Sequence, residues 1–163
     1  MLQYANTRQK EGCCIHELLD EVLIITQDRI THKNIVVSKE YGLQNIKIEL
    51  NGPEVKIALT NIVINAIEAM PSGKGKLKLS TKSIGNKYVM QIEDNGCGIS
   101  KENIPYIFKP YFTNKPGGLG LGLSIANDIL LLNHVRVIVE STEGQGTIFL
   151  LIFDKNNLNS IIQ

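Results

Sequence analysis

Residues 59–70 read LTNIVINAIEAM, and this stretch decides the predicted fold. Apolar side chains occupy most of its positions, and Pro71-Ser72-Gly73 follows at once, so we expect a largely buried helix over about 54–70. Residues three and four apart share one face of a helix. That face carries Glu54, Ala58, Asn61, Asn65 and Glu68. It is either a solvated face with a local hydrogen bond or a ligand set for a metal ion or phosphate, because an amide oxygen is a hard donor that suits Mg²⁺.

The rest of the chain predicts a mixed sheet with helices on one face. Apolar spacing of three and four predicts helices over 16–32 and 120–132, the second following a glycine-rich stretch. Alternating runs predict strands, of which two form a hairpin around Gly85-Asn86. These strands are expected over 35–41, 46–50, 76–84, 87–94, 136–142 and 146–153. Strand pairs separated by helices do not form strict βαβ alternation. The polar last ten residues are expected to be a loosely held tail, which gives a domain over 1–153 and a tail over 154–163.

A second candidate feature, Asp94-Asn95-Gly96-Cys97-Gly98, ends the predicted strand over 87–94. Glycines at alternate positions allow the backbone to turn sharply and another group to come close. A carboxylate at the strand end can accept hydrogen bonds from an exocyclic amine such as that of adenine. The alternative is an ordinary hairpin turn, but no partner strand follows directly.

The third feature is the run GGLGLGLS over 117–124, immediately before a predicted helix. Glycines at a helix start expose backbone N–H groups that suit phosphate. The run is not a P-loop, because no Lys-Ser/Thr pair follows its last glycine, and its G-x-G-x-G spacing is not the dinucleotide fingerprint. Lys115 lies just upstream and could reach a terminal phosphate, or it is an ordinary exposed lysine. The loop over about 95–119 is too long for a simple connection and is expected to be functional or disordered.

Composition narrows the class of protein. The chain has 163 residues with 43% hydrophobic and 20% charged side chains, which fits one soluble globular domain. A net charge of +1 gives no reason to expect nucleic acid or a membrane as the main partner. Cys13, Cys14 and Cys97 form no disulfide framework and no zinc motif, which favours a reducing cytoplasm. No apolar run approaches the roughly 18 to 20 residues of a membrane helix, and no signal peptide is recognised.

Taken together, these blocks resemble the nucleotide-binding boxes of the histidine-kinase catalytic domain, from the superfamily of gyrase, Hsp90 chaperones and MutL. LTNIVINAIEAM resembles the N box, IEDNGCGIS the first glycine box, IFKPYFTNKP the phenylalanine box and GGLGLGLSIAN the second glycine box. STEGQGTIFLLIF is similar to the closing strand pair. The resemblance covers about 15–153 and implies a two-layer α/β sandwich, with a mixed sheet covered on one face by helices and an ATP lid over about 109–119.

The resemblance also implies roles for individual residues. Asn65 would bind Mg²⁺ with Asn61 beside it near the phosphates, and Asp94 would bind the adenine amine, supported by Thr147. Gly96 and Gly98 would allow close approach to the base, and Lys115 would touch the γ-phosphate. Phe108 and Phe112 would anchor the lid. The remaining nucleotide-binding positions are expected in the second glycine box, at Gly118, Leu119, Gly120, Leu121, Gly122 and Leu123.

The sequence departs from the family pattern at three places. Asn61 stands where ATP-hydrolysing relatives carry a general-base Glu, which favours a kinase, since a histidine acceptor is itself the nucleophile. Leu119 replaces a usual Thr, which puts hydrogen bonding in the lid in doubt. Asn133 and the next residues replace glycines, and Asn133 could cap the preceding helix in the left-handed conformation.

The implied function is transfer of the γ-phosphate of Mg-ATP to a histidine in two-component signalling. The expected partners are an acceptor-histidine dimerisation domain and a response regulator. His16 matches the opening helix of the catalytic domain better than an acceptor helix, so the acceptor is expected upstream or on another protein. His32 and His134 are expected at the surface. The alternatives are a degenerate ATP-binding interaction module and a serine kinase of the anti-sigma type, against which Asn61 argues.

Overall fold

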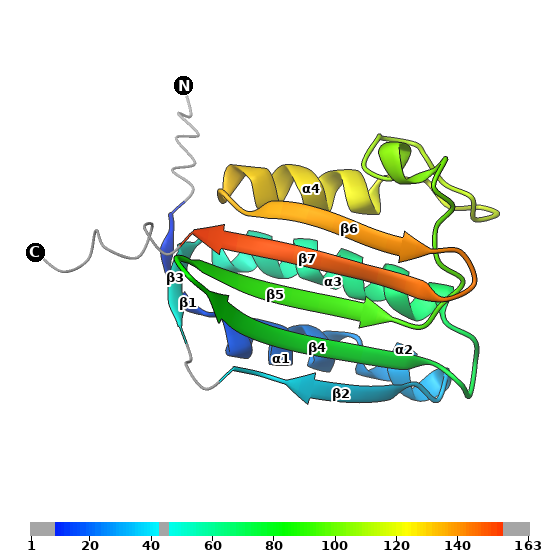
Figure 1. Cartoon of the computed structure of the whole chain (residues 1–163), viewed down its shortest axis with the longest axis horizontal. Helices are drawn as coiled ribbons and strands as arrows, with labels where there is room; N and C mark the ends of the chain where they lie inside the picture. The colour runs from blue at the N-terminus through cyan, green and yellow to red at the C-terminus, as the bar shows by residue number, and fades with distance from the viewer. Residues whose placement is uncertain (1–8, 43–45, 155–163) are drawn as a thin grey trace, which may run out of the picture.

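The computed structural model describes residues 9–42 and 46–154, and its main feature is a five-stranded mixed sheet. Its strands lie in the order β2-β4-β5-β7-β6 (Figure 1). Strand β2 pairs with β4 in parallel, and the other neighbours are antiparallel. The bounds are β2 Val36–Glu40, β4 Lys76–Ile84, β5 Lys87–Asp94, β6 Arg136–Thr142 and β7 Gly146–Asp154. Asp154, which was predicted to begin the tail, is the last residue of β7. Residues 1–8 of the predicted domain and residues 155–163 of the predicted tail lie outside the described residues.

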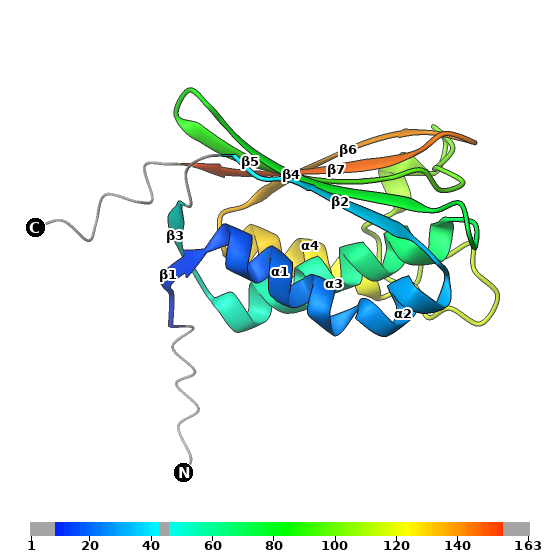
Figure 2. The same cartoon turned by 90° about the horizontal axis from the view of Figure 1, so that it is seen from below.

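Four helices cover one face of this sheet, as Figure 2 shows. They are α1 Ile15–Ile25, α2 Gln27–His32, α3 Gly52–Ala69 and α4 Gly122–Leu132. The apolar face of α3 meets the inward side chains of the strands, and both sets are fully buried. Its members include Val55, Leu59, Ile62 and Val63 on the helix and Leu77, Leu79, Met90 and Leu151 on the strands. The two-layer sandwich with one helical face is therefore confirmed. Among the described residues, no helix is both long and apolar enough to cross a membrane.

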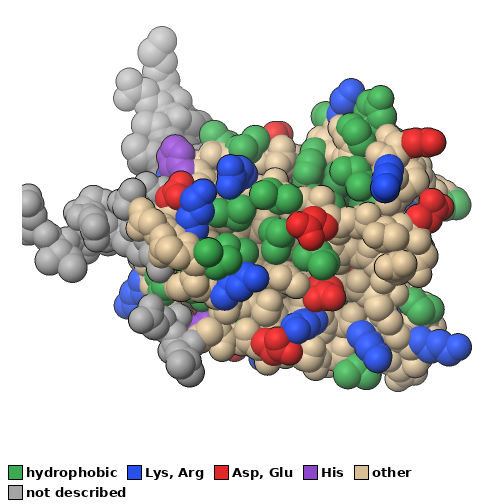
Figure 3. All heavy atoms as spheres, in the orientation of Figure 1, with side chains coloured by type: hydrophobic (Ala, Val, Ile, Leu, Met, Phe, Trp, Pro, Cys, Tyr) green, Lys and Arg blue, Asp and Glu red, His purple; other side chains and the backbone are tan. Residues whose placement is uncertain are grey.

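None of the helices in residues 9–42 and 46–154 lies on the opposite face of the sheet, and apolar side chains gather on that face (Figure 3). Strand register places Ile138 of β6 beside Leu150 of β7, and Leu150 beside Gln91 of β5. Ile138 is exposed and Leu150 is half-buried. This alternation of inward and outward side chains is what the period of two along a strand produces.

Two predictions about the first third of the chain are wrong. The helix expected over 16–32 is two helices, because Thr26 is buried between them and its hydroxyl donates to the carbonyl oxygen of Val22 at 2.8 Å. The two strands expected before α3 do not pair with each other. Strand β3 (Lys47–Leu50) instead pairs with β1 (Glu11–Cys14) in a separate two-stranded sheet. Strand β1 is only four residues long, and its sequence EGCC has no alternation that could have revealed it.

Both ends of α3 are fixed by side chains. Asn51 caps the start, where its Oδ1 accepts from the backbone N–H of Glu54 at 3.2 Å. At the other end the Lys33 ammonium donates to the last carbonyl oxygens, those of Ile67, Glu68 and Met70, at 2.9, 3.0 and 2.9 Å. A cation at the C-terminus of a helix also interacts favourably with the helix dipole. The helix that carries both asparagines is thus held at each end.

The end of α4 differs from the expectation. Asn133 has φ −92°, whereas His134 takes the left-handed conformation with φ 59°. Asn133 is buried, and its side chain bridges two elements instead of adopting the left-handed cap. Its Oδ1 accepts from the backbone N–H of Asn51 at 2.8 Å, and its Nδ2 donates to the carbonyl oxygen of Ile129 at 2.9 Å. The contact with Asn51 is 82 residues away in sequence, so no local pattern could indicate it.

Candidate nucleotide site

A cavity of about 460 Å³ lies between the C-terminal half of α3, the end of β5, the start of β7 and the segment before α4. This volume is typical of sites for small molecules and cofactors. Among its lining residues are most of the predicted nucleotide-binding positions: Asn61, Asn65, Asp94, Gly98, Lys115, Gly118, Leu119, Gly120, Gly122, Leu123 and Thr147. Gly96 and Leu121 are not among the lining residues. Apolar side chains, including Ile64, Ile99, Ile107 and Phe149, supply walls that sequence reasoning did not single out.

Asp94 is the buried carboxylate of this cavity. It is the last residue of β5, it lies opposite Thr147 of β7, and it is only 6% exposed. Its Oδ1 accepts from the backbone N–H of Gly96 at 2.8 Å. Burial raises the pKa of Asp94 to about 6, and hydrogen bonds from the backbone of Gly96 and Thr147 oppose that rise. A buried carboxylate that lines a cavity can accept a hydrogen bond from an amine donor of a ligand.

The raised pKa of Asp94 predicts a pH-dependent stability. Because the native pKa lies above the ordinary value of 3.8, the native state binds the proton more tightly than the unfolded chain. The contribution of protonated Asp94 to the free energy of unfolding is complete below about pH 4 and is lost as the pH rises through about 6. Asp94→Asn should remove this dependence, so the variant should gain up to about 3 kcal/mol of unfolding free energy relative to wild type between pH 4 and 7. Urea unfolding at several pH values measures it, and parallel pH profiles would contradict it.

Thr147 contacts Asp94 through its backbone, while its hydroxyl has another partner. Thr147 Oγ1 lies 2.9 Å from Ser141 Oγ on β6. Ser141 Oγ also donates to the carbonyl oxygen of Gly146 at 2.8 Å and accepts from the backbone N–H of Ile99 at 2.8 Å. Ser141 therefore ties the loop after Asp94 to the β6–β7 hairpin. Nothing in its sequence context distinguished it from an ordinary strand residue.

Gly96 and Gly98 both meet protein backbone at close range. A Cβ on Gly96 would lie 2.7 Å from the carbonyl oxygen of Ala69, at the end of α3. A Cβ on Gly98, whose φ is 69°, would lie 2.1 Å from the carbonyl oxygen of Thr142. The sequence predicted that these glycines allow close approach to a base. In the structure they allow the backbone after Asp94 to come close to α3 and to the β6–β7 turn. Approach to a bound base stays a prediction for these two glycines.

Asn61 and Asn65 line the cavity from α3, and Lys115 meets Asn65 there. Asn65 Oδ1 accepts from Lys115 Nζ at 2.9 Å, and the same ammonium contacts the Glu68 carboxylate. Asn61 faces the start of α4, where its Oδ1 lies 3.7 Å from the position of a Cβ built on Gly122. Amide oxygens and a carboxylate are hard donors, so this end of the cavity fits Mg²⁺ and phosphate groups. The role of Glu68 in contacting Lys115 was missed because it joins residues 47 apart.

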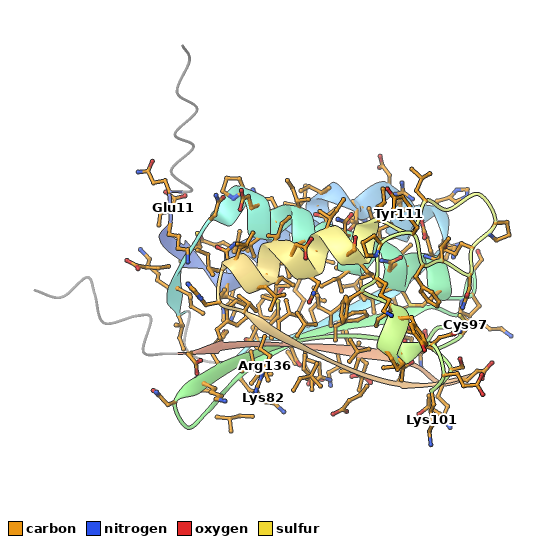
Figure 4. All side chains as sticks on the ribbon, turned by 90° about the horizontal axis from the view of Figure 1, so that it is seen from above. Glu11, Lys82, Cys97, Lys101, Tyr111 and Arg136 are labelled. Carbon is orange, nitrogen blue, oxygen red and sulfur yellow. The ribbon has the colours of Figure 1, made fainter. Side chains whose placement is uncertain are left out.

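The segment over 109–119 forms the predicted lid. The backbone N–H of Tyr111, which has φ 65°, donates to the carbonyl oxygen of Gly120 at 2.9 Å and closes the base of the lid. Figure 4 shows Tyr111 and Cys97 at the same end of the molecule, opposite Glu11. Phe108 packs edge-on against Phe149 at 6.4 Å, and Phe112 lies 6.1 Å from the Tyr106 ring. Both phenylalanines pack against the core, which fits the role of anchors.

The start of α4 completes this wall of the cavity. Leu121 is the N-cap residue and makes no side-chain cap hydrogen bond, so no side chain caps the first turn of the helix. Ser124 Oγ donates back to the carbonyl oxygen of Leu121 at 3.1 Å. Leu119, which replaces the usual Thr, is 76% exposed and has no polar side-chain atom to offer a ligand. Backbone N–H groups at a helix start are suited to bind phosphate.

The histidines lie away from this cavity. His16 Nε2 lies 2.8 Å from Thr81 Oγ1 and 2.9 Å from the Tyr88 hydroxyl, and its ring stacks on Tyr41 at 4.6 Å. Burial lowers the pKa of His16. A ring held in this way joins α1 to the sheet, which agrees with the view that His16 is not the acceptor. His32 and His134 are exposed, as expected.

The fold and the cavity together define an α/β sandwich whose lid segment lies along a cavity lined by Asn65, Asp94 and Lys115. Residues 50–157 match the family described as "Histidine kinase-, DNA gyrase B-, and HSP90-like ATPase", and the chain belongs to this family. AtoS, a signal transduction histidine-protein kinase of Escherichia coli, is 31% identical over 159 residues, which are 96% of this chain and 26% of AtoS. Sporulation kinase C of Bacillus subtilis is 32% identical over 140 residues, 85% of this chain and 32% of that kinase.

Solved structures show the same fold. The catalytic domain of histidine kinase ThkA superposes with a TM-score of 0.80 at 30% identity, covering 90% of this chain and 96% of that domain. ThkA in complex with the response regulator TrrA superposes with a TM-score of 0.77 at 27% identity, covering 92% of this chain and 43% of that chain. The present chain spans about a quarter to a third of the length of the two curated relatives.

Proposed function

We propose that this chain binds Mg-ATP in the cavity and transfers the γ-phosphate to a histidine on an upstream segment or a partner protein. The observation that carries the proposal is the convergence in one cavity of the buried Asp94 carboxylate and the Asn65–Lys115 pair. One end fits an adenine amine and the other fits phosphate and a divalent cation. The histidine kinases among the relatives and the structural match to the ThkA catalytic domain support the reaction class.

Each residue has a separate task in this proposal. Asp94 accepts a hydrogen bond from the adenine amine, while Gly96 and Thr147 hold its carboxylate in place. Asn65 supplies a metal ligand, and Lys115 places a positive charge at the γ-phosphate. Bound Mg²⁺ would supply neutralisation of the phosphate charge. Gly118, Gly120 and Gly122 line the cavity and would let the backbone come close to the phosphates. The first turn of α4, which begins at Gly122, would supply N–H groups to them.

The absence of a carboxylate at Asn61 fits phosphate transfer better than hydrolysis. A water nucleophile benefits from a general base, whereas an acceptor imidazole carries its own lone pair. Asn61 lies against Gly122, where it can hydrogen-bond phosphate oxygens but cannot remove a proton. We therefore expect an acceptor-histidine dimerisation domain as one partner. We expect a response regulator as the other, because the similar kinase ThkA forms a complex with the response regulator TrrA. We propose that the domain is cytoplasmic, either as a soluble protein or as the cytoplasmic part of a membrane-bound sensor, because its free cysteines favour a reducing compartment.

The function is tested by nucleotide binding followed by phosphate transfer. Calorimetry should show Mg²⁺-dependent ATP binding by wild type, and Asn65→Ala should make the remaining binding insensitive to Mg²⁺. Asn114→Ala, a lid substitution in the same cavity, is the control that should keep the Mg²⁺ dependence. Wild type should then phosphorylate a supplied acceptor-histidine domain with an acid-labile phosphate. No adenine-nucleotide binding, or a Mg²⁺ dependence that survives in Asn65→Ala, would contradict the assignment.

A further inference from the structure

Lys115 Nζ marks a cation position between two side-chain oxygens of α3. It donates to Asn65 Oδ1 at 2.9 Å and contacts Glu68 Oε2. Asn65 and Glu68 are three residues apart, so they lie on one face of the helix, and both line the cavity. An amide oxygen and a carboxylate oxygen that converge on an ammonium are also the donors that Mg²⁺ prefers.

Glu68 carries a negative charge at the C-terminal end of α3, where the helix dipole disfavours it. The last turn of this helix carries no basic residue. The surrounding structure offsets that cost with cations from other elements. Arg29 Nη1 lies 3.9 Å from Glu68 Oε1, and Lys115 contacts the other carboxylate oxygen. A residue that breaks a local rule in this way is more often explained by function than by stability.

The Lys115 ammonium is held by the oxygen pair, and a strongly negative γ-phosphate would compete with that pair for it. The proposed function turns its ammonium toward the phosphate, which would leave the Glu68 carboxylate beside a polyphosphate of the same sign. Like charges a few ångströms apart repel, and a divalent cation between them removes the repulsion. The side chains of Glu68 and Lys115 are 40% and 45% exposed, which leaves room for the waters that Mg²⁺ retains.

We propose that Glu68 joins Asn65 in holding Mg²⁺, and that Mg²⁺ and the Lys115 ammonium exchange at this oxygen pair. The inference rests on the proposed function for the nucleotide that brings the metal. Glu68 is then a second protein ligand of the metal, in addition to Asn65. The Lys115 ammonium occupies the metal position until Mg²⁺ binds. Lid movement and metal binding are then coupled, because one cation leaves as the other arrives.

The first test measures ATP binding by calorimetry, in excess Mg²⁺ and in EDTA, for wild type, Glu68→Gln and Glu17→Gln. Glu68→Gln should weaken binding about tenfold in Mg²⁺, the scale on which loss of a supporting group lowers metal affinity. In EDTA it should bind ATP as tightly as wild type or more tightly, because a negative charge near the phosphates has been removed. Glu17→Gln, an exposed glutamate of α1, should match wild type in both conditions. Equal effects of Glu68→Gln with and without Mg²⁺, or no effect in either, would overturn the inference.

The second test needs no nucleotide and therefore separates this inference from the proposed function. Mn²⁺ should broaden the Asn65 side-chain amide signal in a ¹⁵N-resolved spectrum. Lys115→Met should show the broadening at lower Mn²⁺ concentration than wild type, because the competing ammonium is gone. The double variant with Glu68→Gln should lose it. If the Asn65 signal of Lys115→Met broadens at no lower Mn²⁺ concentration than that of wild type, the proposed exchange of Mg²⁺ with the Lys115 ammonium is wrong, even if ATP binds. If the Mn²⁺ results are as expected but ATP does not bind, the cation site is supported and the kinase proposal fails.

Discussion

Asp94→Asn should lower the affinity for ATP by about 10- to 100-fold while leaving the fold intact. The carboxylate receives the backbone N–H groups of Gly96 and Thr147, and the proposed site adds the adenine amine as a third donor. An asparagine replaces one acceptor oxygen with an NH₂ group that must face a donor. Hydrogen bonds to charged groups are worth about 1.5–3 kcal/mol, which corresponds to this range of affinity.

The measurement is calorimetric titration with ATP in Mg²⁺ at pH 7.5, where the Asp94 carboxylate is ionised. Asp128→Asn is the matched control, because Asp128 is an exposed aspartate of α4 that does not line the cavity. Far-ultraviolet circular dichroism of both variants should match wild type. Since Asp94→Asn is also expected to raise stability at this pH, lost binding cannot come from unfolding. If Asp94→Asn binds ATP with wild-type affinity, the proposed contact between Asp94 and the adenine amine is wrong.

Local signals in the sequence predicted the elements that frame the site. The apolar positions and the following Pro71-Ser72-Gly73 predicted α3, alternation around Gly85-Asn86 predicted the β4–β5 hairpin, and the glycine run predicted the start of α4. Each of these signals lies within one element, where period and turn chemistry act directly. The resemblance of four boxes then predicted which of these elements surround a nucleotide. The cavity lined by Asn65 and Asp94 agrees with that prediction.

Features that depend on distant contacts could not be predicted in the same way. The pairing of β1 with β3 and the parallel pairing of β2 with β4 join strands across helices, and pairing partners leave no trace within a short strand. Ser141 acquires its role only when the β6–β7 hairpin meets the loop after Asp94. The contact of Glu68 with Lys115 needs the lid to fold back on α3. Sequence periodicity reports burial and spacing along one element, and it does not report which other element lies opposite.

Gly98→Ala should destabilise the protein by about 3–5 kcal/mol and abolish nucleotide binding. An alanine at φ 69° costs about 1–2 kcal/mol, and its Cβ would lie 2.1 Å from the carbonyl oxygen of Thr142, so one backbone segment must move. Two hydrogen bonds hold these segments together, from Gly144 N–H to the carbonyl oxygen of Cys97 at 2.7 Å and from Ile99 N–H to Ser141 Oγ at 2.8 Å. A displaced loop would therefore also disturb the Ser141 contact with Thr147, opposite Asp94.

Gly144→Ala separates the steric clash from the backbone conformation. Gly144 lies in the facing turn with φ 79°, and a Cβ there would meet no heavy atom within 4 Å. Gly144→Ala should lower the free energy of unfolding by only about 1–2 kcal/mol, because alanine is disfavoured in the left-handed conformation. Its affinity for ATP should stay near that of wild type. Urea unfolding followed by circular dichroism gives both costs, and calorimetry gives both affinities. If the two alanine variants lose the same stability, the close approach of Gly98 to Thr142 does not hold the loop in place, and the Asp94 end of the site must be fixed by other contacts.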